Sequence, residues 1–533
     1  MKVYPILRKL LKWSYIDCKC FDIANSSSWL KSLSILLEEY CNSDPAVIDY
    51  MDQERSIDII WKLLQTITAL SGYDSTKFIN LSSNEYKIHI LVLDWIMISV
   101  TALNSKDRKL VNPDSKKEIY LHTGIVGRGL CILSNYLLEA DNNINSTLGI
   151  KYGDNINKFY DVCTKTELFE GTLGLIINFK MYSAEIENDY IDFVYSNFAS
   201  AVNNVCYVVG SLPFDVIESI LNSYGMILDP SNMQNDSSDK EDYEYTVSMI
   251  YTSLAQMFHD QTDACIVFIE GKNQLKFMYK VAKECLESQT EISLDWIRAI
   301  SKIIKHISKL SYDEVFEDCN VYKLMFEIMN TVADNTITIN LVEAISNFMV
   351  FSKHIYLDLT SEGNFSRIII LSCEASLNNN TIDKSLPVGE VKMAVCNFLL
   401  NYLDEITSEP SEGIKNTSKL DKKYEYINSI SSISWTYKIC ELTLKAIFDF
   451  LEHDKHHYKL IRGALELFEN VVSFANDQWE DDEQDLFYDL IHNDELIDRI
   501  GNLDLVDEEL MIYVVKIMAE NELDLHFSEL TMS

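Results

Sequence analysis

Residues 294–310 read LDWIRAISKIIKHISKL, and this stretch decides the class of fold. Its apolar residues recur every three or four positions, so in a helix they share one broad face. These residues are Leu294, Ile297, Ile300, Ile303, Ile304, Ile307 and Leu310. Residues 57–70 carry the same pattern. The periodicity predicts amphipathic helices that bury one side.

Glycine and proline are scarce along the whole chain. The sequence holds 16 glycines and 7 prolines in 533 residues, against a typical use of about 7% and 5%. Sheets joined by tight turns need these residues, whereas long helices avoid them. Residues 231–386 contain no proline at all. The composition therefore predicts an all-α protein made of stacked helices.

A short pattern returns six times: a small or aliphatic residue, a large apolar one, any residue, an asparagine, then an aromatic residue or valine. The copies are Ile132-Leu133-Ser134-Asn135-Tyr136, Leu175-Ile176-Ile177-Asn178-Phe179, Ala201-Val202-Asn203-Asn204-Val205, Ala344-Ile345-Ser346-Asn347-Phe348, Ala394-Val395-Cys396-Asn397-Phe398 and Leu467-Phe468-Glu469-Asn470-Val471. A polar amide inside an apolar helix costs free energy unless it finds hydrogen-bond partners. Its return predicts a repeated structural unit.

The pattern resembles the last helix of armadillo repeats, an Ala-rich helix that ends in Leu-x-Asn-Leu. The intervals Asn135 to Asn178 and Asn347 to Asn397 are 43 and 50 residues, near the roughly 40–47 of such repeats. The interval from Asn178 to Asn204 is 26 residues, too short for a whole repeat, and no clean copy lies between Asn204 and Asn347. The resemblance implies a right-handed superhelical solenoid of the armadillo/HEAT kind.

The length exceeds what one hydrophobic core serves, so the chain forms several domains or one repeat array. Polar stretches predict mobile loops between helices. They cover residues 103–118, 140–157, 229–244, 376–388 and 404–424. None has the length or composition of a linker between independent domains. We therefore expect a single extended solenoid over residues 1–533.

The chain is strongly acidic, with 82 acidic and 45 basic residues and a net charge of −37. Such a field repels nucleic-acid phosphate and anionic lipid, which argues against a DNA, RNA or membrane surface. It favours a protein partner with basic segments. Solubility alone explains the charge equally well.

Twelve cysteines are scattered singly, and only Cys18 and Cys20 lie close together, without the second pair of a zinc site. This pattern is typical of reduced thiols in an intracellular protein. Lys9 and Lys12 interrupt any secretory signal, and no run of about 18 apolar residues could span a bilayer. Residues 1–16 fit a first helix better than a mitochondrial presequence. We expect a cytoplasmic or nuclear protein.

No catalytic or nucleotide-binding signature occurs in the sequence. Gly124, Gly127 and Gly129 form G-x-x-G-x-G without a preceding strand, and we interpret them as a turn between helices. The three histidines in residues 453–457 lie among charged residues, which favours a solvated helix end over a metal site. We predict no enzymatic activity, no cofactor and no metal.

The armadillo resemblance implies a role for five of the asparagines. They are Asn135, Asn178, Asn347, Asn397 and Asn470. In armadillo proteins that bind extended peptides, such amides line a concave groove and hold the ligand backbone, because an amide both donates and accepts. The alternative is that each asparagine links neighbouring turns inside the stack, and at any single position we favour that alternative.

Four basic residues form a second candidate site, which we call the basic ridge. They are Arg298, Lys302, Lys305 and Lys309, and their spacing of 4, 3 and 4 puts them on one helical face opposite the isoleucines. Like charges in this arrangement repel, so an acidic counterpart is expected. It is either a partner's carboxylates or phosphates, or acidic residues of the adjacent repeat, and we favour the adjacent repeat.

The third candidate is Trp479 within the acidic segment 477–485. A tryptophan among carboxylates is suited to a basic or amphipathic peptide through stacking and charge. The alternative, which we favour, is a solvated loop between helices.

These features predict a non-enzymatic scaffold, adaptor or assembly chaperone that holds a partner protein along a concave surface. A cargo adaptor of the nuclear-transport type and a chaperone for a basic protein are its concrete forms. Residues 201–204 followed by Leu212-Pro213-Phe214-Asp215 resemble synembryn-type exchange chaperones, which implies a guanine-nucleotide exchange factor or GTPase chaperone as an alternative. A structural subunit of a large complex is a third hypothesis.

Overall fold

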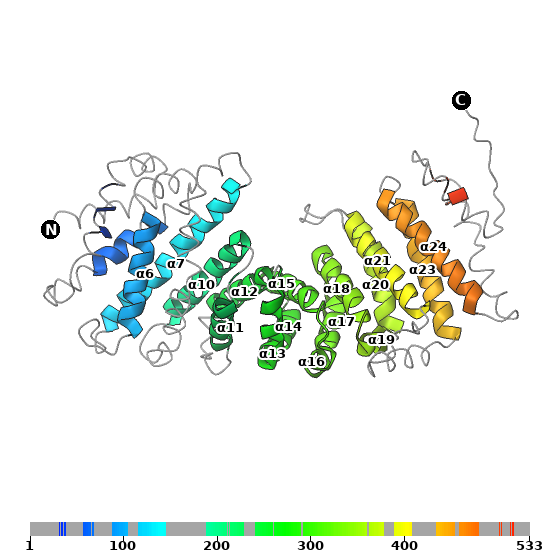
Figure 1. Cartoon of the computed structure of the whole chain (residues 1–533), viewed down its shortest axis with the longest axis horizontal. Coiled ribbons are helices and arrows are strands. Elements are labelled where there is room, and N and C mark those ends of the chain that lie inside the picture. The colour runs from blue at the N-terminus through cyan, green and yellow to red at the C-terminus, as the bar shows by residue number, and fades with distance from the viewer. Residues whose placement is uncertain are drawn as a thin grey trace, which may run out of the picture. The chain divides into compact units, whose positions relative to one another are not determined.

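The computed structural model describes twelve main segments of the chain. They are residues 57–68 without residue 66, 88–104, 116–144, 188–209, 214–228, 240–259, 261–288, 291–359, 362–377, 388–407, 433–453 and 458–478, with a few single positions elsewhere. Every regular element among these residues is a helix, as Figure 1 shows. The chain divides into two compact units. The N-terminal unit comprises Met1–Phe277 and Thr290–Ala299, and the C-terminal unit comprises Met278–Gln289 and Ile300–Ser533.

The N-terminal unit is a row of helices in which each packs on the next. The row runs through α6 (Ile88–Asn104), α7 (Lys116–Ile144), α10 (Asn188–Val209) and α12 (Lys240–Met257). Beside it, α11 (Phe214–Ile227) packs on α13 (Thr262–Glu270). Two further helices, α14 (Lys272–Ser288) and α15 (Glu291–Ile307), each contribute residues to both units.

The C-terminal unit repeats a group of three helices, one short and two longer. The first group is α16 (Asp313–Asp318), α17 (Val321–Thr331) and α18 (Asn335–Met349). The second group is α19 (Lys353–Leu359), α20 (Glu362–Leu377) and α21 (Val388–Thr407). Two long helices follow, α23 (Ile433–His453) and α24 (Tyr458–Gln478).

Successive groups stack so that like helices touch. Helix α17 contacts α20 and α20 contacts α23, which makes one layer; α18 contacts α21 and α21 contacts α24, which makes a second. We call these the second-helix layer and the third-helix layer. A short helix followed by two longer ones, stacked in register, is the armadillo/HEAT arrangement. The all-α prediction and the armadillo/HEAT class are confirmed.

Burial follows the apolar periodicity seen in the sequence. In α15 the isoleucines at 297, 300, 303, 304 and 307 are all nearly inaccessible to solvent. The helix ends three residues before the predicted Leu310, because the amides of Lys309 and Leu310 bond to carbonyls three residues back, not four. In α18 the side chain of Asp334 caps the helix by accepting a hydrogen bond from the Ile337 amide at 2.9 Å.

The turn predicted at Gly124, Gly127 and Gly129 is wrong, because all three glycines lie inside α7. They are buried, and α7 packs closely against α6 there. A β-carbon on Gly129 would lie 2.4 Å from Cγ1 of Ile96 in α6. The missing side chain is therefore what lets the two helices approach, and it has no part in a turn.

Several helices continue into segments predicted as loops. Helix α7 runs to Ile144 and α21 to Thr407, while α12 already begins at Lys240. Helices α6 and α20 overlap the predicted loops 103–118 and 376–388 by two residues each. Polar side chains on the solvent face of a helix end resemble loop composition, which explains these shifts. Helix α7 already begins at Lys116 and α21 at Val388, inside the same two loops 103–118 and 376–388, and the rest of the five loops lies outside the described residues.

Replacement of Gly129 by valine should destabilise the protein. The new side chain meets Ile96, which is fully buried. Overpacking of this kind costs about 1–3 kcal/mol. We expect a lower thermal unfolding midpoint for Gly129→Val by circular dichroism.

Gly363→Val is the matched control, because a β-carbon on Gly363 of α20 has no neighbour within 4 Å. Its midpoint should stay close to that of the unsubstituted protein. Equal midpoints for the two variants would contradict the close approach of α6 and α7.

Candidate partner-binding face

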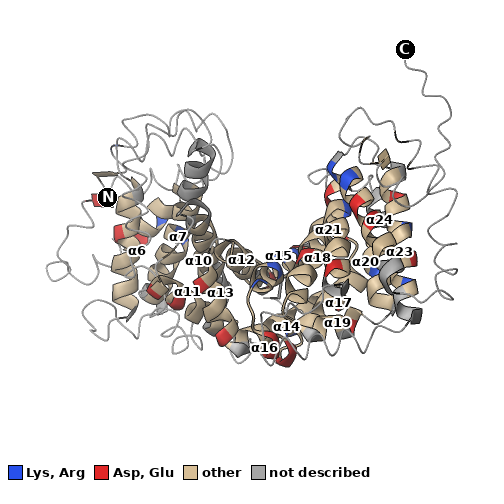
Figure 2. Cartoon of the chain, turned by 45° about the vertical axis from the view of Figure 1, so that its right-hand side comes forward, with Lys and Arg blue, Asp and Glu red and all other residues tan. Residues whose placement is uncertain are grey.

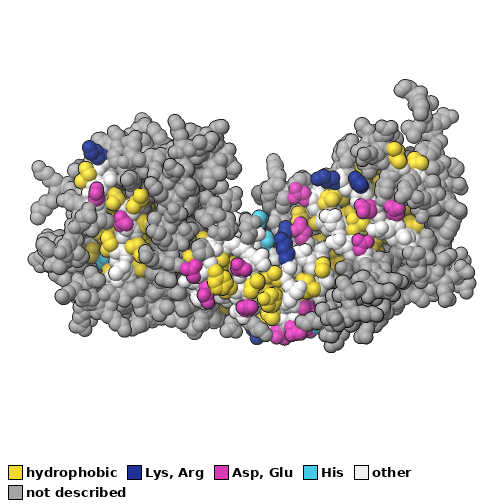
Figure 3. Space-filling model, viewed as in Figure 1, with side chains coloured by type: hydrophobic (Ala, Val, Ile, Leu, Met, Phe, Trp, Pro, Cys, Tyr) yellow, Lys and Arg dark blue, Asp and Glu magenta, His cyan; other side chains and the backbone are white. Residues whose placement is uncertain are grey.

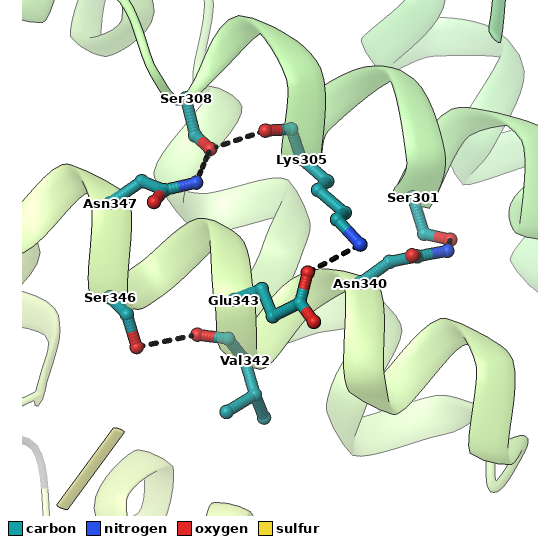
Figure 4. A network of polar contacts seen from close by, with 8 residues as sticks. All are labelled: Ser301, Lys305, Ser308, Asn340, Val342, Glu343, Ser346 and Asn347. Atoms are coloured by element: carbon teal, nitrogen blue, oxygen red, sulfur yellow. Dashed lines mark hydrogen bonds and ion pairs between the residues drawn. The ribbon is translucent and has the colours of Figure 1, made fainter. Parts of the chain in front are cut away.

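Within the C-terminal unit, asparagines on α18 bond to a serine on α15 and to Ser308 directly after that helix, as Figure 4 shows. The side chain of Asn340 donates to Oγ of Ser301 at 3.1 Å, and that of Asn347 donates to Oγ of Ser308 at 2.9 Å. Ser308 in turn donates to the Lys305 carbonyl at 2.7 Å. The two partners of each Asn–Ser pair are 39 residues apart in the sequence. The same offset therefore brings the asparagine to its serine in both pairs.

The N-terminal unit uses the same chemistry between α7 and α10. The amide of Asn204 donates to the carbonyl and to the hydroxyl of Ser134, both at 2.9 Å. The Ser134 hydroxyl lies 2.6 Å from that of Ser200. An asparagine of one helix therefore satisfies a serine of the helix before it, at two separate places in the chain.

The predicted asparagines fall into different environments. Asn347 has its partner inside the stack, which is the alternative favoured from the sequence. Asn135 is half-buried on α7 and also makes polar contacts. Asn178 lies outside the described residues. Asn397 on α21 is exposed and Asn470 on α24 is half-buried, and neither has a hydrogen bond to any residue that the structure describes.

The basic ridge is partly neutralised within the fold. Arg298 pairs with Asp295 of its own helix at 3.0 Å. Lys305 forms an ion pair with Glu343 of α18, which is the adjacent-repeat counterpart that the spacing predicts. Lys302 and Lys309 have no ion pair among the described residues. Two of the four basic residues of the ridge are therefore neutralised by ion pairs, and Lys302 and Lys309 keep an uncompensated positive charge.

Lys302 is the unusual member of the ridge. Its side chain is half-buried. Burial, and secondly the charge of Lys305, lowers the pKa of the Lys302 ammonium below its ordinary value. A lysine placed in this way favours an anion close by, because an anion would offset both effects.

The third-helix layer presents a mixed polar strip to solvent. On α21 the accessible residues include Glu390, Met393, Asn397, Leu400, Asn401 and Asp404. On α24 they include Lys459, Arg462, Glu466, Asn470 and Ser473. Figures 2 and 3 show basic and acidic side chains interspersed on the C-terminal unit, in small groups. Carboxylates, amides and thioether or aliphatic groups are therefore available together on one layer.

A polar cluster between consecutive repeats escaped the sequence analysis. Asp313 at the start of α16 accepts hydrogen bonds from the hydroxyls of Tyr322, at 2.6 Å, and Ser352. His354 lies 2.8 Å from Glu317 and stacks on Tyr322 with ring centroids 6.4 Å apart. Asp313 and Ser352 are again 39 residues apart. This shared offset is the sequence feature that could have predicted the cluster. It indicates that the cluster connects two consecutive repeats.

A second missed feature is a buried ion pair in the same unit. Lys392 of α21 is fully buried, and its ammonium lies 3.0 Å from the Asp449 carboxylate of α23. A lysine inside an apolar stretch gives no sequence signal of its partner, because the carboxylate comes from a different helix. The pair joins the two layers.

The remaining predicted features lie mostly outside the described residues. Trp479 with its acidic neighbours, and His456 and His457, cannot be placed on the fold. Among the residues that the structure does describe, no group of His, Cys, Asp or Glu is arranged to hold a metal ion. The described cysteines carry free thiols. No described helix combines the length and apolar character needed to cross a bilayer.

The fold places this chain among the armadillo-like α-solenoids. No protein-family model matches its sequence, and no curated protein matches it. Among solved structures, a SYS-1/POP-1 complex is similar at 12% identity and a TM-score of 0.42, with 97% of this chain and 84% of that chain covered.

Two further structures match at 9% identity. SYS-1 alone has a TM-score of 0.37, with 95% of this chain and 93% of that chain covered. A structure concerned with the phosphorylation switch between cadherin and β-catenin has a TM-score of 0.35, with 91% and 100% covered. Scores this low support no inference about function, and the class of the fold follows from the chain's own three-helix groups.

The different environments of Asn347 and Asn397 predict different effects on stability. Asn347→Ala removes the hydrogen bond to Ser308, which is worth about 0.5–1.5 kcal/mol. We expect a lower thermal midpoint for Asn347→Ala. Asn397→Ala, at the matching position of the next repeat, should leave the midpoint unchanged because the side chain is exposed and has no described partner.

A double-mutant cycle with Ser308→Ala isolates the Asn347–Ser308 bond. The double variant should lose less stability than the sum of the two single variants. Strict additivity, or an equal loss for Asn397→Ala, would refute the structural difference between the two asparagines.

Proposed function

We propose that this protein is a non-enzymatic binding scaffold that holds an extended segment of a partner protein across its third-helix layer. The contact region is the accessible strip of α21 and α24. Basic residues of the partner segment face its carboxylates. The scaffold serves as an adaptor or an assembly chaperone for that partner.

The amides of Asn397 and Asn470 carry this proposal. They occupy the motif position at which Asn347 is bound inside the stack, yet they have no hydrogen-bond partner among the described residues. An amide left accessible in this way has one donor group and one acceptor to offer to a peptide backbone. Asn397 lies on α21 and Asn470 on the neighbouring helix α24. A partner chain that crosses both helices would therefore meet both amides.

Accessible carboxylates next to these amides support a basic partner. Glu390 precedes Asn397 by two turns on α21, and Glu466 precedes Asn470 by one turn on α24. Neither carboxylate has an ion pair among the described residues. The net charge of −37 adds a long-range attraction that speeds encounter with a cationic segment.

Apolar side chains complete the strip. Met393 lies one turn before Asn397 and Leu400 nearly one turn after it, and both are half-exposed. Methionine adapts its shape to different apolar partners. Amides for the backbone, carboxylates for charge and apolar groups for side chains together favour an extended peptide over a compact ligand.

Charge reversal on the strip should weaken binding of a basic peptide. We expect Glu390→Lys with Glu466→Lys to raise the Kd of a fluorescent lysine-rich peptide by about tenfold or more at low salt. Asn397→Ala should also weaken binding, without any loss of thermal stability. Fluorescence anisotropy at two salt concentrations measures both effects.

Glu441→Lys is the control, because Glu441 is an exposed carboxylate on α23 in the second-helix layer. A loss of binding in this control equal to that of the strip variants would show non-specific attraction to the acidic chain. That result would overturn the proposed site.

A further inference from the structure

The basic ridge keeps a positive charge that the fold does not neutralise. Within the part of the ridge that belongs to the C-terminal unit, Glu343 engages Lys305, and Lys302 and Lys309 are left without a described ion pair. Other lysines of that unit, such as Lys392 and Lys438, do have carboxylate partners within 3.0 Å. Lys445, Lys459 and Arg462 also lack an ion pair among the described residues, but these three are exposed, so the half-buried Lys302 is the exception.

The position of Lys302 makes this exception costly. Half-burial removes part of its hydration, and Lys305 lies one turn away on the same face. Both effects disfavour the ammonium form. Substitution by a neutral residue would remove the cost, so an unpaired lysine at this place points to an anion supplied from outside the chain.

Lys302 and Lys309 also continue the face used in the proposed function. Helix α15 is joined to α18 by the two Asn–Ser bonds and the Lys305–Glu343 pair, and α18 packs on α21. Lys302 on α15 and Lys309 in the turn after it therefore lie one helix before the third-helix layer. Their charge is opposite to that of Glu390 and Glu466.

We infer that Lys302 and Lys309 bind a carboxylate-rich stretch of the same partner segment, so that the partner is bipolar, with acidic residues on one side of its basic residues. This inference rests on the proposed function and specifies its partner. The carboxylates come from aspartate or glutamate side chains. Glu343 is paired with Lys305 and so does not compete for Lys302 and Lys309.

Helix spacing sets the distance between the two parts of the partner. Neighbouring packed helices lie about 8–10 Å apart, and an extended chain advances about 3.3 Å per residue. Two helix steps from α15 to α21 correspond to about five or six residues, and three steps to α24 to about seven to nine. Acidic and basic residues of the partner should be separated by this interval.

Four synthetic peptides with capped ends test the inference by fluorescence anisotropy on the full chain. One carries a glutamate block, about six neutral residues and a lysine block. The second has the reverse order, the third has lysines only, and the fourth has glutamates only. One of the two bipolar peptides should bind about tenfold more tightly than the lysine-only peptide.

The double variant Lys302→Gln with Lys309→Gln should bind that bipolar peptide no more tightly than it binds the lysine-only peptide. Lys438→Gln with Lys445→Gln on α23 removes the same charge from the other layer and should leave the bipolar preference intact. Equal loss in both double variants would overturn the inference, as would a bipolar peptide that binds no better than lysine alone.

The outcomes separate this inference from the proposed function. Lysine-only binding that depends on Glu390 and Glu466, without any bipolar preference, would leave the proposed function standing and refute the role of the ridge. Absence of binding by every lysine-containing peptide would refute the proposed function itself. A fifth peptide, with phosphoserines in place of the glutamates, tests the carboxylate assignment, and a gain in affinity with this peptide alone would refute it.

Discussion

Burial of apolar side chains between one helix group and the next is the constraint on which the whole fold depends. The isoleucines of α15 and the apolar residues of α18 are shielded only because neighbouring helices cover them. A single group of three helices has too few neighbours to do this alone, so each group requires the next. Polar atoms caught between groups must then find partners there, and the Asn–Ser bonds, the Asp313 cluster and the Lys392–Asp449 pair meet that need.

This requirement separates two populations of similar residues. Asn347 and Asn397 share a sequence motif, yet one is used by the stack and the other is accessible. Lys305 and Lys302 are one turn apart on one helix, yet only the first has a carboxylate. Binding capacity therefore follows from which polar groups the packing does not consume.

The helix class was predictable from the sequence, since apolar periodicity and scarce glycine and proline report directly on helices. The motif asparagines were also recognised as groups that need partners, but their partners were not. Ser301 and Ser308 are ordinary serines, and nothing marks them until the offset of 39 residues to Asn340 and Asn347 is noticed. The glycines of α7 misled the prediction, because a glycine that permits close packing and one that permits a turn look alike in a sequence.

The offset of 39 residues between hydrogen-bonded partners has an evolutionary consequence. From Ser308 to Asn347 the chain takes 39 residues, whereas from Asn347 to Asn397 it takes 50. Part of the difference falls between Leu377 and Val388, where α20 ends and α21 begins, and part in the greater length of α20 compared with α17. One residue added inside α18 would turn every later side chain of that helix by about 100° and expose its core face. Insertions and deletions should therefore accumulate in the connections between helices, and this protein's relatives should differ in length there while keeping the helices of the third layer unchanged.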